Sequence, residues 1–171
     1  LQHLQRLMPA EAEVRVSVSD NYIGFDLGDT FLHSRLLEGP FPNYRPVIPT
    51  NNKHKVTVER ESLTQATRRV AILANTLTHQ IKLGMRGDAV ALSVSTPDLG
   101  EAQEDVVAAY QGPEMGIGFN AQFLLDILKC MDTDDVEFAL DRADTAAMVR
   151  PAAAKDGEEF FCLLMPLRLA D

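Results

Sequence analysis

Basic side chains are in the minority in this sequence of 171 residues. Sixteen Lys and Arg residues stand against twenty-five Asp and Glu residues, for a formal net charge of −9. Non-specific affinity for nucleic acid comes from cations that neutralise phosphates. The charge balance therefore excludes a protein that holds nucleic acid by bulk charge, and any such role must come from a local basic face or from topology.

Long apolar runs are also missing. No stretch approaches the roughly 18 to 20 apolar residues that cross a bilayer, and no basic segment followed by an apolar one opens the chain. We therefore expect a cytoplasmic protein with no membrane partner. The chain begins with LQHLQRL, residues 1–7, which already has the pattern of a helix, so we expect a fragment whose natural start has been removed.

Metal-binding and catalytic motifs are absent as well. Cys130 and Cys162 stand in apolar surroundings without CxxC or Cys/His spacing, which favours two buried, reduced thiols. The four histidines are scattered singly, so we expect no metal and no cofactor. Glu101, Glu104 and Asp105 lack a partnering His or Lys motif, which favours a solvated strand edge and predicts that the chain is not an enzyme.

What remains is an ordinary globular composition, with 46% hydrophobic and 24% charged residues. Apolar periodicity predicts helices at 1–8, 61–75 and 121–131, the last with Asn120 as its N-cap. Alternating apolar residues predict strands at 13–18, 22–27, 30–37, 55–60, 88–96, 101–110, 116–119, 134–140 and 145–150. Residues 38–52 contain four prolines and are predicted to be a linker.

The order of predicted elements repeats along the chain. A helix, a turn and three strands occur around Val14 and again around Val136, 122 residues later. A period near the length of a domain suggests tandem similar domains, although two such units can also arise by chance.

Two apolar features do not fit a simple core. Ile72 lies about 180° around its helix from the apolar stripe, which indicates an interface, with an isolated exposed residue as the alternative. The chain also closes with FFCLLMPLRL, residues 160–169, where Pro166 cannot donate to a strand ladder. Part of this run is predicted to leave the sheet while remaining apolar. The alternative is a buried core strand over residues 160–165, and we expect Phe160 to Cys162 to lie in the core.

Four segments in order and spacing resemble the bacterial sliding clamps, the beta subunits of DNA polymerase III. They are FPNYRPVIP (41–49), ESLTQATRRVAILAN (61–75), EMGIGFNAQFLLDILK (114–129) and MPLRL (165–169). The resemblance implies an α+β fold of tandem similar domains, with helices packed on antiparallel sheets. Residues 1–44 are then the second half of a middle domain, and residues 45–171 a complete third domain. It also implies a head-to-tail homodimer of full-length chains, closed as a ring around duplex DNA.

The resemblance further implies three sets of site residues. An apolar groove would dock short linear peptides of the replicative DNA polymerase, the clamp loader and other clamp-binding proteins. Its matching residues are Pro42, Val47, Asn120, Phe123, Ala146, Leu163, Leu164, Met165, Pro166, Leu167 and Arg168. The ring interface is matched by Ile72 and Leu73, and the DNA-facing candidates are Arg6, Arg68, Arg69 and Lys129.

Two departures and one rival interpretation accompany the resemblance. Pro46 replaces a residue that is commonly basic in the family, and Thr78 one that is often aromatic or bulky, so the groove is expected to be shallower or to choose different peptides. The rival is a peptide-binding interaction module without DNA encirclement. It shares the groove but not the ring, so peptide binding alone cannot separate the two.

Overall fold

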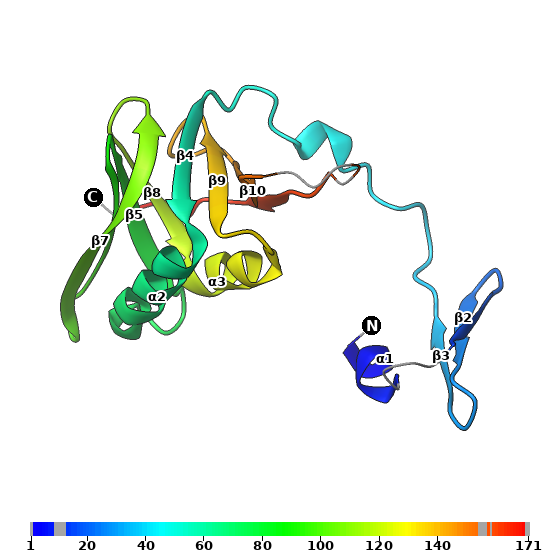
Figure 1. Ribbon diagram of the computed structural model, residues 1–171. Helices are drawn as coiled ribbons and strands as arrows, with labels where there is room; N and C mark the ends of the chain where they lie inside the picture. The colour runs from blue at the N-terminus through cyan, green and yellow to red at the C-terminus, as the bar shows by residue number, and fades with distance from the viewer. Residues whose placement is uncertain (1, 9–12, 154–156, 158, 170–171) are drawn as a thin grey trace. The chain divides into compact units, whose positions relative to one another are not determined.

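The structure of the chain is a computed structural model that describes residues 2–8, 13–153, 157 and 159–169 (Figure 1). It consists of two compact units, Leu1–Asn43 and Tyr44–Asp171. Among the described residues, no helix is long and apolar enough to cross a membrane.

The first unit is a helix followed by a three-stranded antiparallel meander. Helix α1 (Gln2–Leu7) precedes β1 (Arg15–Val18), β2 (Tyr22–Asp26) and β3 (Phe31–Arg35), which pair in that order. The alternating valines of the first strand predict one buried face, but this is wrong, because Val16 and Val18 are both exposed. The described residues of this unit form a three-stranded sheet, which is too small to bury both valine side chains.

The described residues of the second unit form two helices, two 3-10 turns and eight strands. Its first half contains η1 (Arg45–Val47), β4 (His54–Glu59), α2 (Arg60–Val70), η2 (Ala71–Leu73), β5 (Gln80–Arg86) and β6 (Ala89–Thr96). Its second half contains β7 (Gly100–Gln111), β8 (Met115–Asn120), α3 (Ala121–Cys130), β9 (Asp135–Leu140), β10 (Ala147–Pro151) and β11 (Cys162–Leu164).

All eight strands form one antiparallel sheet in the order β11-β10-β9-β4-β7-β6-β5-β8. Strand β7 joins its two halves, because its first part pairs with β6 and residues 108–111 pair with β4. Helices α2 and α3 pack against each other and cover the same side of the sheet (Figure 1). The predicted α+β class, with helices on antiparallel sheets, is confirmed.

Both helices bury one apolar stripe and begin at a side-chain cap. The Glu59 carboxylate accepts a hydrogen bond from the Ser62 amide, and α2 then buries Leu63, Ala66 and Val70. Helix α3 buries Leu124 and Leu128 behind the predicted Asn120 cap. Capping satisfies amide groups that have no partner inside the helix, so these local sequences determine where the helices begin.

Several predictions about single elements need correction. Helix α2 ends at Val70 and continues only as the 3-10 turn η2, and strand β5 was not predicted. Phe160 is exposed, and β11 begins only at Cys162, so residues 160–162 are not a core strand. Cys130 is exposed and Cys162 half-buried, so the prediction of two buried thiols is also wrong. Burial still raises the pKa of the Cys162 thiol, and the neighbouring Cys130 raises it further.

Two buried threonines of α2 provide a matched test of this packing. The Thr64 hydroxyl donates to the Arg60 carbonyl oxygen at 2.7 Å, whereas the Thr67 hydroxyl oxygen has no hydrogen-bond partner among the described residues. An unpaired buried hydroxyl costs about 1–3 kcal/mol. We therefore expect Thr67→Val to raise the free energy of unfolding in urea by about 1 kcal/mol. Thr64→Val should leave it unchanged or lower it, and equal effects of the two substitutions would contradict this packing.

Candidate functional site

The C-terminal tail links the two edge strands of the large sheet. Strand β11 pairs with β10 at one edge, with Leu164 opposite Ala147. Three residues later, the Leu167 amide donates to the Gly118 carbonyl oxygen of β8, at the other edge, at 2.8 Å. The Gln80 side-chain amide also donates to the Arg168 carbonyl oxygen at 2.9 Å. The tail thus leaves the sheet at Met165, as Pro166 predicts, and returns to its opposite edge.

Gly118 makes this return possible. A Cβ atom at this position would lie 2.7 Å from the Leu167 carbonyl oxygen and 2.9 Å from Leu169 Cδ2. Leu169 Cδ2 is the end of a flexible side chain and could move, but the contact with the Leu167 backbone oxygen is incompatible with the observed path of the tail. The absence of a side chain at Gly118 is therefore required here.

Three tail residues and three residues near them form a mixed apolar and polar surface. We call it the tail surface, and it consists of Asn120, Phe123, Ala146, Met165, Pro166 and Leu167. Met165 is 67% exposed and Phe123 60% exposed, while the other apolar members are half-buried. Continuing the β10–β11 register by one residue brings Ala146 opposite Met165.

Five predicted groove residues lie outside the tail surface as defined above. Leu164 is only 3% exposed and belongs to the core, so its side chain cannot contact a peptide and its assignment is corrected. Leu163 is half-buried, on the opposite face of its strand from Leu164. Val47 is exposed in η1, and Arg168 is exposed at the end of the tail. Pro42 belongs to the first unit, so its place in the site stays a prediction.

Asn120 fixes the polar end of the tail surface. Its side-chain oxygen accepts from the amides of Gln122 and Phe123, and its side-chain nitrogen donates to the Thr78 carbonyl oxygen at 3.0 Å. The loop after η2 is therefore attached to the start of α3. Thr78 itself is exposed and offers a small side chain beside the surface.

A second candidate surface lies at the end of α2 and along β7. Ile72 is 75% exposed, whereas Leu73 is half-buried against the core and its carbonyl oxygen accepts from the Thr96 hydroxyl. Within the described part of the chain, residues 100–107 of β7 pair with β6 alone, and their other edge has no strand partner. Val107, at the end of this edge, is 85% exposed. A groove of about 760 Å³ runs between α2 and β7.

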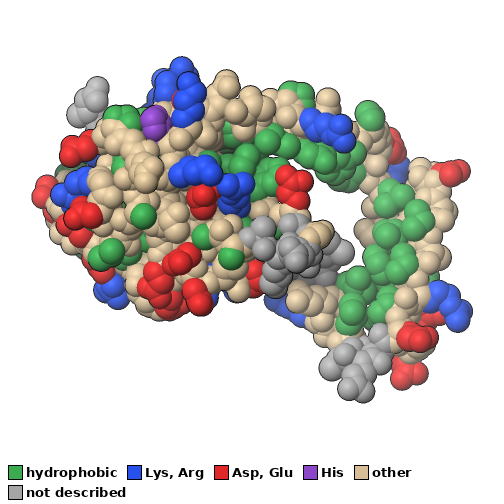
Figure 2. Space-filling view, turned by 45° about the horizontal axis from the view of Figure 1, so that its top comes forward, with side chains coloured by type: hydrophobic (Ala, Val, Ile, Leu, Met, Phe, Trp, Pro, Cys, Tyr) green, Lys and Arg blue, Asp and Glu red, His purple; other side chains and the backbone are tan. Residues whose placement is uncertain are grey.

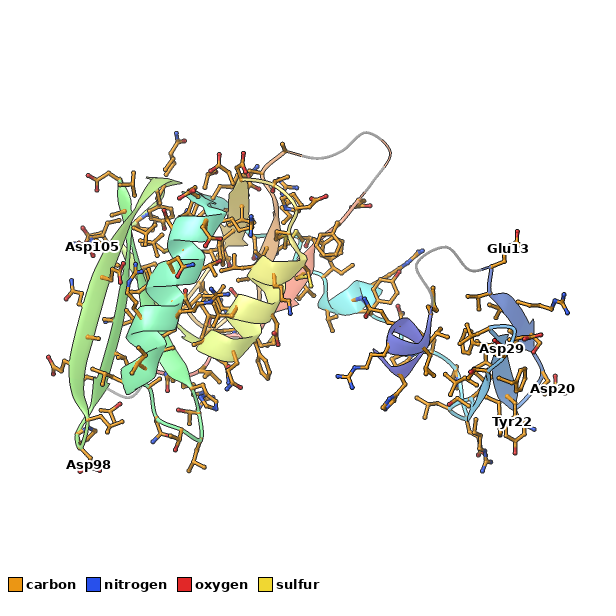
Figure 3. All side chains as sticks on the ribbon, turned by 60° about the horizontal axis from the view of Figure 1, so that its bottom comes forward. Glu13, Asp20, Tyr22, Asp29, Asp98 and Asp105 are labelled. Carbon is orange, nitrogen blue, oxygen red and sulfur yellow. The ribbon has the colours of Figure 1, made fainter. Side chains whose placement is uncertain are left out.

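The open edge agrees with the solvated strand edge that the sequence favours for Glu101, Glu104 and Asp105. Glu104 is bound by Arg69 through two guanidinium nitrogens, one of them 2.9 Å from Glu104 Oε2. These hydrogen bonds lower the pKa of Glu104. The Asp105 carboxylate accepts a hydrogen bond from the Arg86 guanidinium, with 2.8 Å between the two atoms. Asp105 lies on the side of the sheet away from the helices (Figure 3). Arg69 is exposed and paired with Glu104, so the assignment of Arg69 as a DNA-facing residue stays a prediction.

The other DNA-facing candidates lie on exposed helix surfaces. Arg68 on α2 and Lys129 on α3 are both exposed, on helices that cover the same side of the sheet. Arg6 is exposed on α1 in the first unit. Acidic and basic side chains are interspersed over the part of the second unit visible in Figure 2. Any attraction for DNA must therefore be local.

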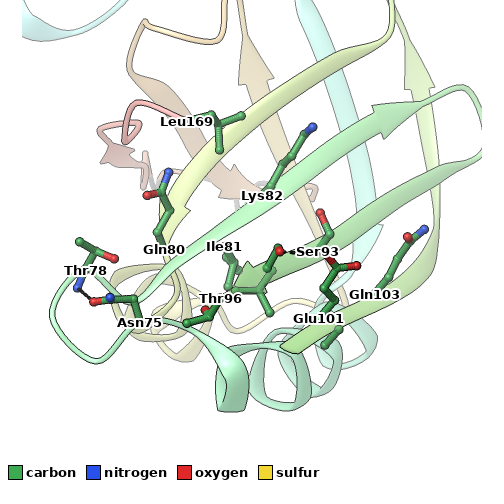
Figure 4. Close-up of a pocket in the computed structure, with 13 residues that line it drawn as sticks. Asn75, Thr78, Gln80, Ile81, Lys82, Ser93, Thr96, Glu101, Gln103 and Leu169 are labelled. Atoms are coloured by element: carbon green, nitrogen blue, oxygen red, sulfur yellow. Dashed lines mark hydrogen bonds between the residues drawn. The ribbon is translucent and has the colours of Figure 1, made fainter. Parts of the chain in front are cut away.

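A separate pocket of about 610 Å³ lies beside β5 and β6 (Figure 4). Polar side chains such as Gln80, Lys82, Ser93 and Glu101 line much of it. None of these lining residues is a buried polar group without a partner. Across the described residues, no group of three or more His, Cys, Asp or Glu could hold a metal ion.

Comparison with known proteins matches this chain to one protein family. The family model of the DNA polymerase III beta subunit, C-terminal domain, matches residues 45–168. The beta sliding clamp of Pseudomonas aeruginosa is 31% identical over 163 residues, 95% of this chain and 44% of that protein. The beta sliding clamp of Proteus mirabilis is 32% identical over 168 residues, 97% of this chain and 45% of that protein.

Solved structures give the same relation. The sliding clamp of Bartonella birtlesii bound to griselimycin superposes with a TM-score of 0.87 at 32% identity, covering 98% of this chain and 44% of that one. The DNA polymerase III beta subunit of Pseudomonas aeruginosa superposes with a TM-score of 0.88 at 31% identity, covering 98% and 45%. The chain thus spans less than half the length of the relatives it matches.

The two glycines of β8 allow the path of the tail to be tested. Gly118→Ala should displace the tail, destabilise the protein by about 1–3 kcal/mol and speed hydrogen exchange of the Leu167 amide. Gly116→Ala is the control, because its Cβ would first meet Lys82 Cε, the movable end of a flexible side chain, at 2.8 Å. Equal exchange rates at Leu167 in both variants would show that the tail does not depend on Gly118.

Proposed function

Since this chain belongs to the DNA polymerase III beta subunit family, the bacterial sliding clamps, we propose that it forms part of a ring that encircles duplex DNA. The family is a non-catalytic processivity subunit of DNA replication, so the chain is not an enzyme. In the proposal, two full-length chains close head to tail in the cytoplasm and keep the replicative polymerase on its template. Residues 1–44 would supply half of the middle domain, and residues 45–171 the third domain.

The observation that carries this proposal is the unpaired edge of β7 beside Ile72. Unpaired strand edges present amide and carbonyl groups that pair readily with another strand. Here the edge lies next to a large exposed apolar side chain and an acidic pair of residues, Glu104 and Asp105. A strand from the first domain of a second chain would pair with the open amide and carbonyl groups of β7 and cover the Ile72 side chain. Leu73, which is half-buried against the core, would lie beneath this contact.

The ring also reconciles an acidic chain with DNA. Each phosphate contact adds salt-dependent affinity and would oppose sliding, whereas a closed ring needs only a modestly positive inner face. We propose Arg68, Lys129 and Arg6 for that face. Arg69 is a weaker candidate, because its charge is already paired with Glu104.

The tail surface is proposed to bind linear peptides of the polymerase, the clamp loader and other clients. Methionine adapts to varied apolar side chains, which suits Met165 to several partners. Asn120 and Arg168 would orient the peptide, and Val47 would be a further apolar contact. Micromolar binding, about −8 kcal/mol, would let clients exchange.

The ring interface is tested by a charge at Ile72 in the full-length parent chain. Ile72→Asp should convert the dimer to a monomer in light scattering at micromolar concentration, because a carboxylate would be buried without a partner. Leu77→Asp is the control, since Leu77 is an apolar residue of similar size in the next loop and is 89% exposed, against 75% for Ile72. A persistent Ile72→Asp dimer would refute this interface.

Peptide docking is tested on the same full-length chain with a synthetic peptide copied from its polymerase's clamp-binding segment. Met165→Ala and Phe123→Ala should each weaken binding about tenfold in calorimetry, a loss of about 1.4 kcal/mol. Dimerisation should not change, because these residues lie outside the proposed ring interface. Ile72→Asp serves as the reciprocal control, which should lose the dimer but keep peptide affinity. Unchanged affinity in both alanine variants would place the peptide elsewhere.

A further inference from the structure

Asn52 lies between η1 and β4, and its side chain joins the linker to a distant hairpin. Its side-chain nitrogen donates to the Ala139 carbonyl oxygen at 2.8 Å and to the Ala146 carbonyl oxygen at 3.0 Å. An asparagine amide has two N–H donors, and here each reaches a different carbonyl. Both bonds are partly buried, so they are shielded from competition with water.

The two acceptors stand at the end of the β9–β10 hairpin. Ala139 is in β9, and Ala146 immediately precedes β10. The turn between them is already held internally, because the Thr145 hydroxyl and amide both bond to the Arg142 backbone. The hairpin end is therefore well defined by itself. The two hydrogen bonds of the Asn52 side chain connect this hairpin end to the segment that carries η1.

This connection leads directly to the tail surface. Ala146 is a member of that surface and lies opposite Met165 by the β10–β11 register. On the other side, Asn52 ends the short segment that begins at η1, where Val47 is exposed. One side chain thus links the hairpin end that carries Ala146 to the linker segment that follows Val47.

We propose that Asn52 is a positioning residue of the peptide site, which sets the spacing between the η1 segment and the tail surface without touching the peptide. This inference rests on the proposed peptide-binding function. Without the amide, the β4–β9 pairing of His54 with Leu140 would still hold the start of β4, but the residues before it would lose their side-chain attachment to the hairpin end. A peptide would then have to order them as it binds, at a cost in affinity.

The test compares Asn52→Ala with Tyr110→Phe in the full-length chain. Tyr110→Phe removes a part-buried side-chain hydrogen bond, from the Tyr110 hydroxyl to the Pro113 carbonyl oxygen at 2.7 Å, outside the tail surface. Both variants are measured where urea titration shows them fully folded, with the same polymerase-derived peptide. Asn52→Ala should weaken peptide binding about tenfold and leave dimerisation unchanged. Tyr110→Phe should lower stability but leave peptide affinity unchanged, which separates positioning from a general loss of stability.

The outcomes distinguish this inference from the function on which it rests. If the wild-type chain binds no peptide, the proposed function fails and the inference with it. If wild type binds and Asn52→Ala binds within about twofold, Asn52 has no positioning role while the peptide site stands. Should Asn52→Ala not fold, hydrogen exchange of the wild-type Asn52 side-chain amide decides. The inference expects slower exchange with peptide bound, and an unchanged rate overturns it.

Discussion

The double pairing of β7 is the constraint on which the second unit depends. One strand of twelve residues pairs with β6 along its first part and with β4 along its last four residues. This arrangement joins two half-sheets through one strand. Residues 100–107 pair with β6 along one edge, and because the pairing with β4 involves only residues 108–111, their other edge is open. The helices α2 and α3 cover the joined sheet on one side. The same constraint therefore creates both the core and the edge that we assign to the ring interface.

The tail adds a second long-range constraint. It connects β11 to β8, the two outermost strands, through the Leu167–Gly118 bond. The backbone that carries the exposed apolar residues of the tail is thus held at both ends, by β11 and by the Leu167–Gly118 hydrogen bond. Ring closure and client binding occupy different surfaces in this account, the β7 edge and the tail surface. A clamp needs that separation, because clients must exchange while the ring stays closed.

The helices and most strands were predictable from local patterns, because caps and periodicity act over a few residues. Asn120 and the Leu63 stripe are examples. Strand β5 was missed although Ile81, Leu83 and Met85 alternate, with Gly84 weakening the pattern. The Arg69–Glu104 pair and the Asn52 bonds join residues 35, 87 and 94 positions apart, and no local signal indicates them. The burial of Leu164 likewise depends on strand register. The peptide and ring residues themselves came from resemblance to a family, not from spacing.

The most direct test of the central claim uses the full-length parent chain, loaded by its ATP-driven clamp loader onto nicked circular DNA. Retention is measured before and after the circle is cut. A topologically closed ring predicts stable retention on the circle and rapid loss once the DNA is linear. Equal retention on circular and linear DNA, falling steeply with salt, would instead show binding by charge and contradict the clamp.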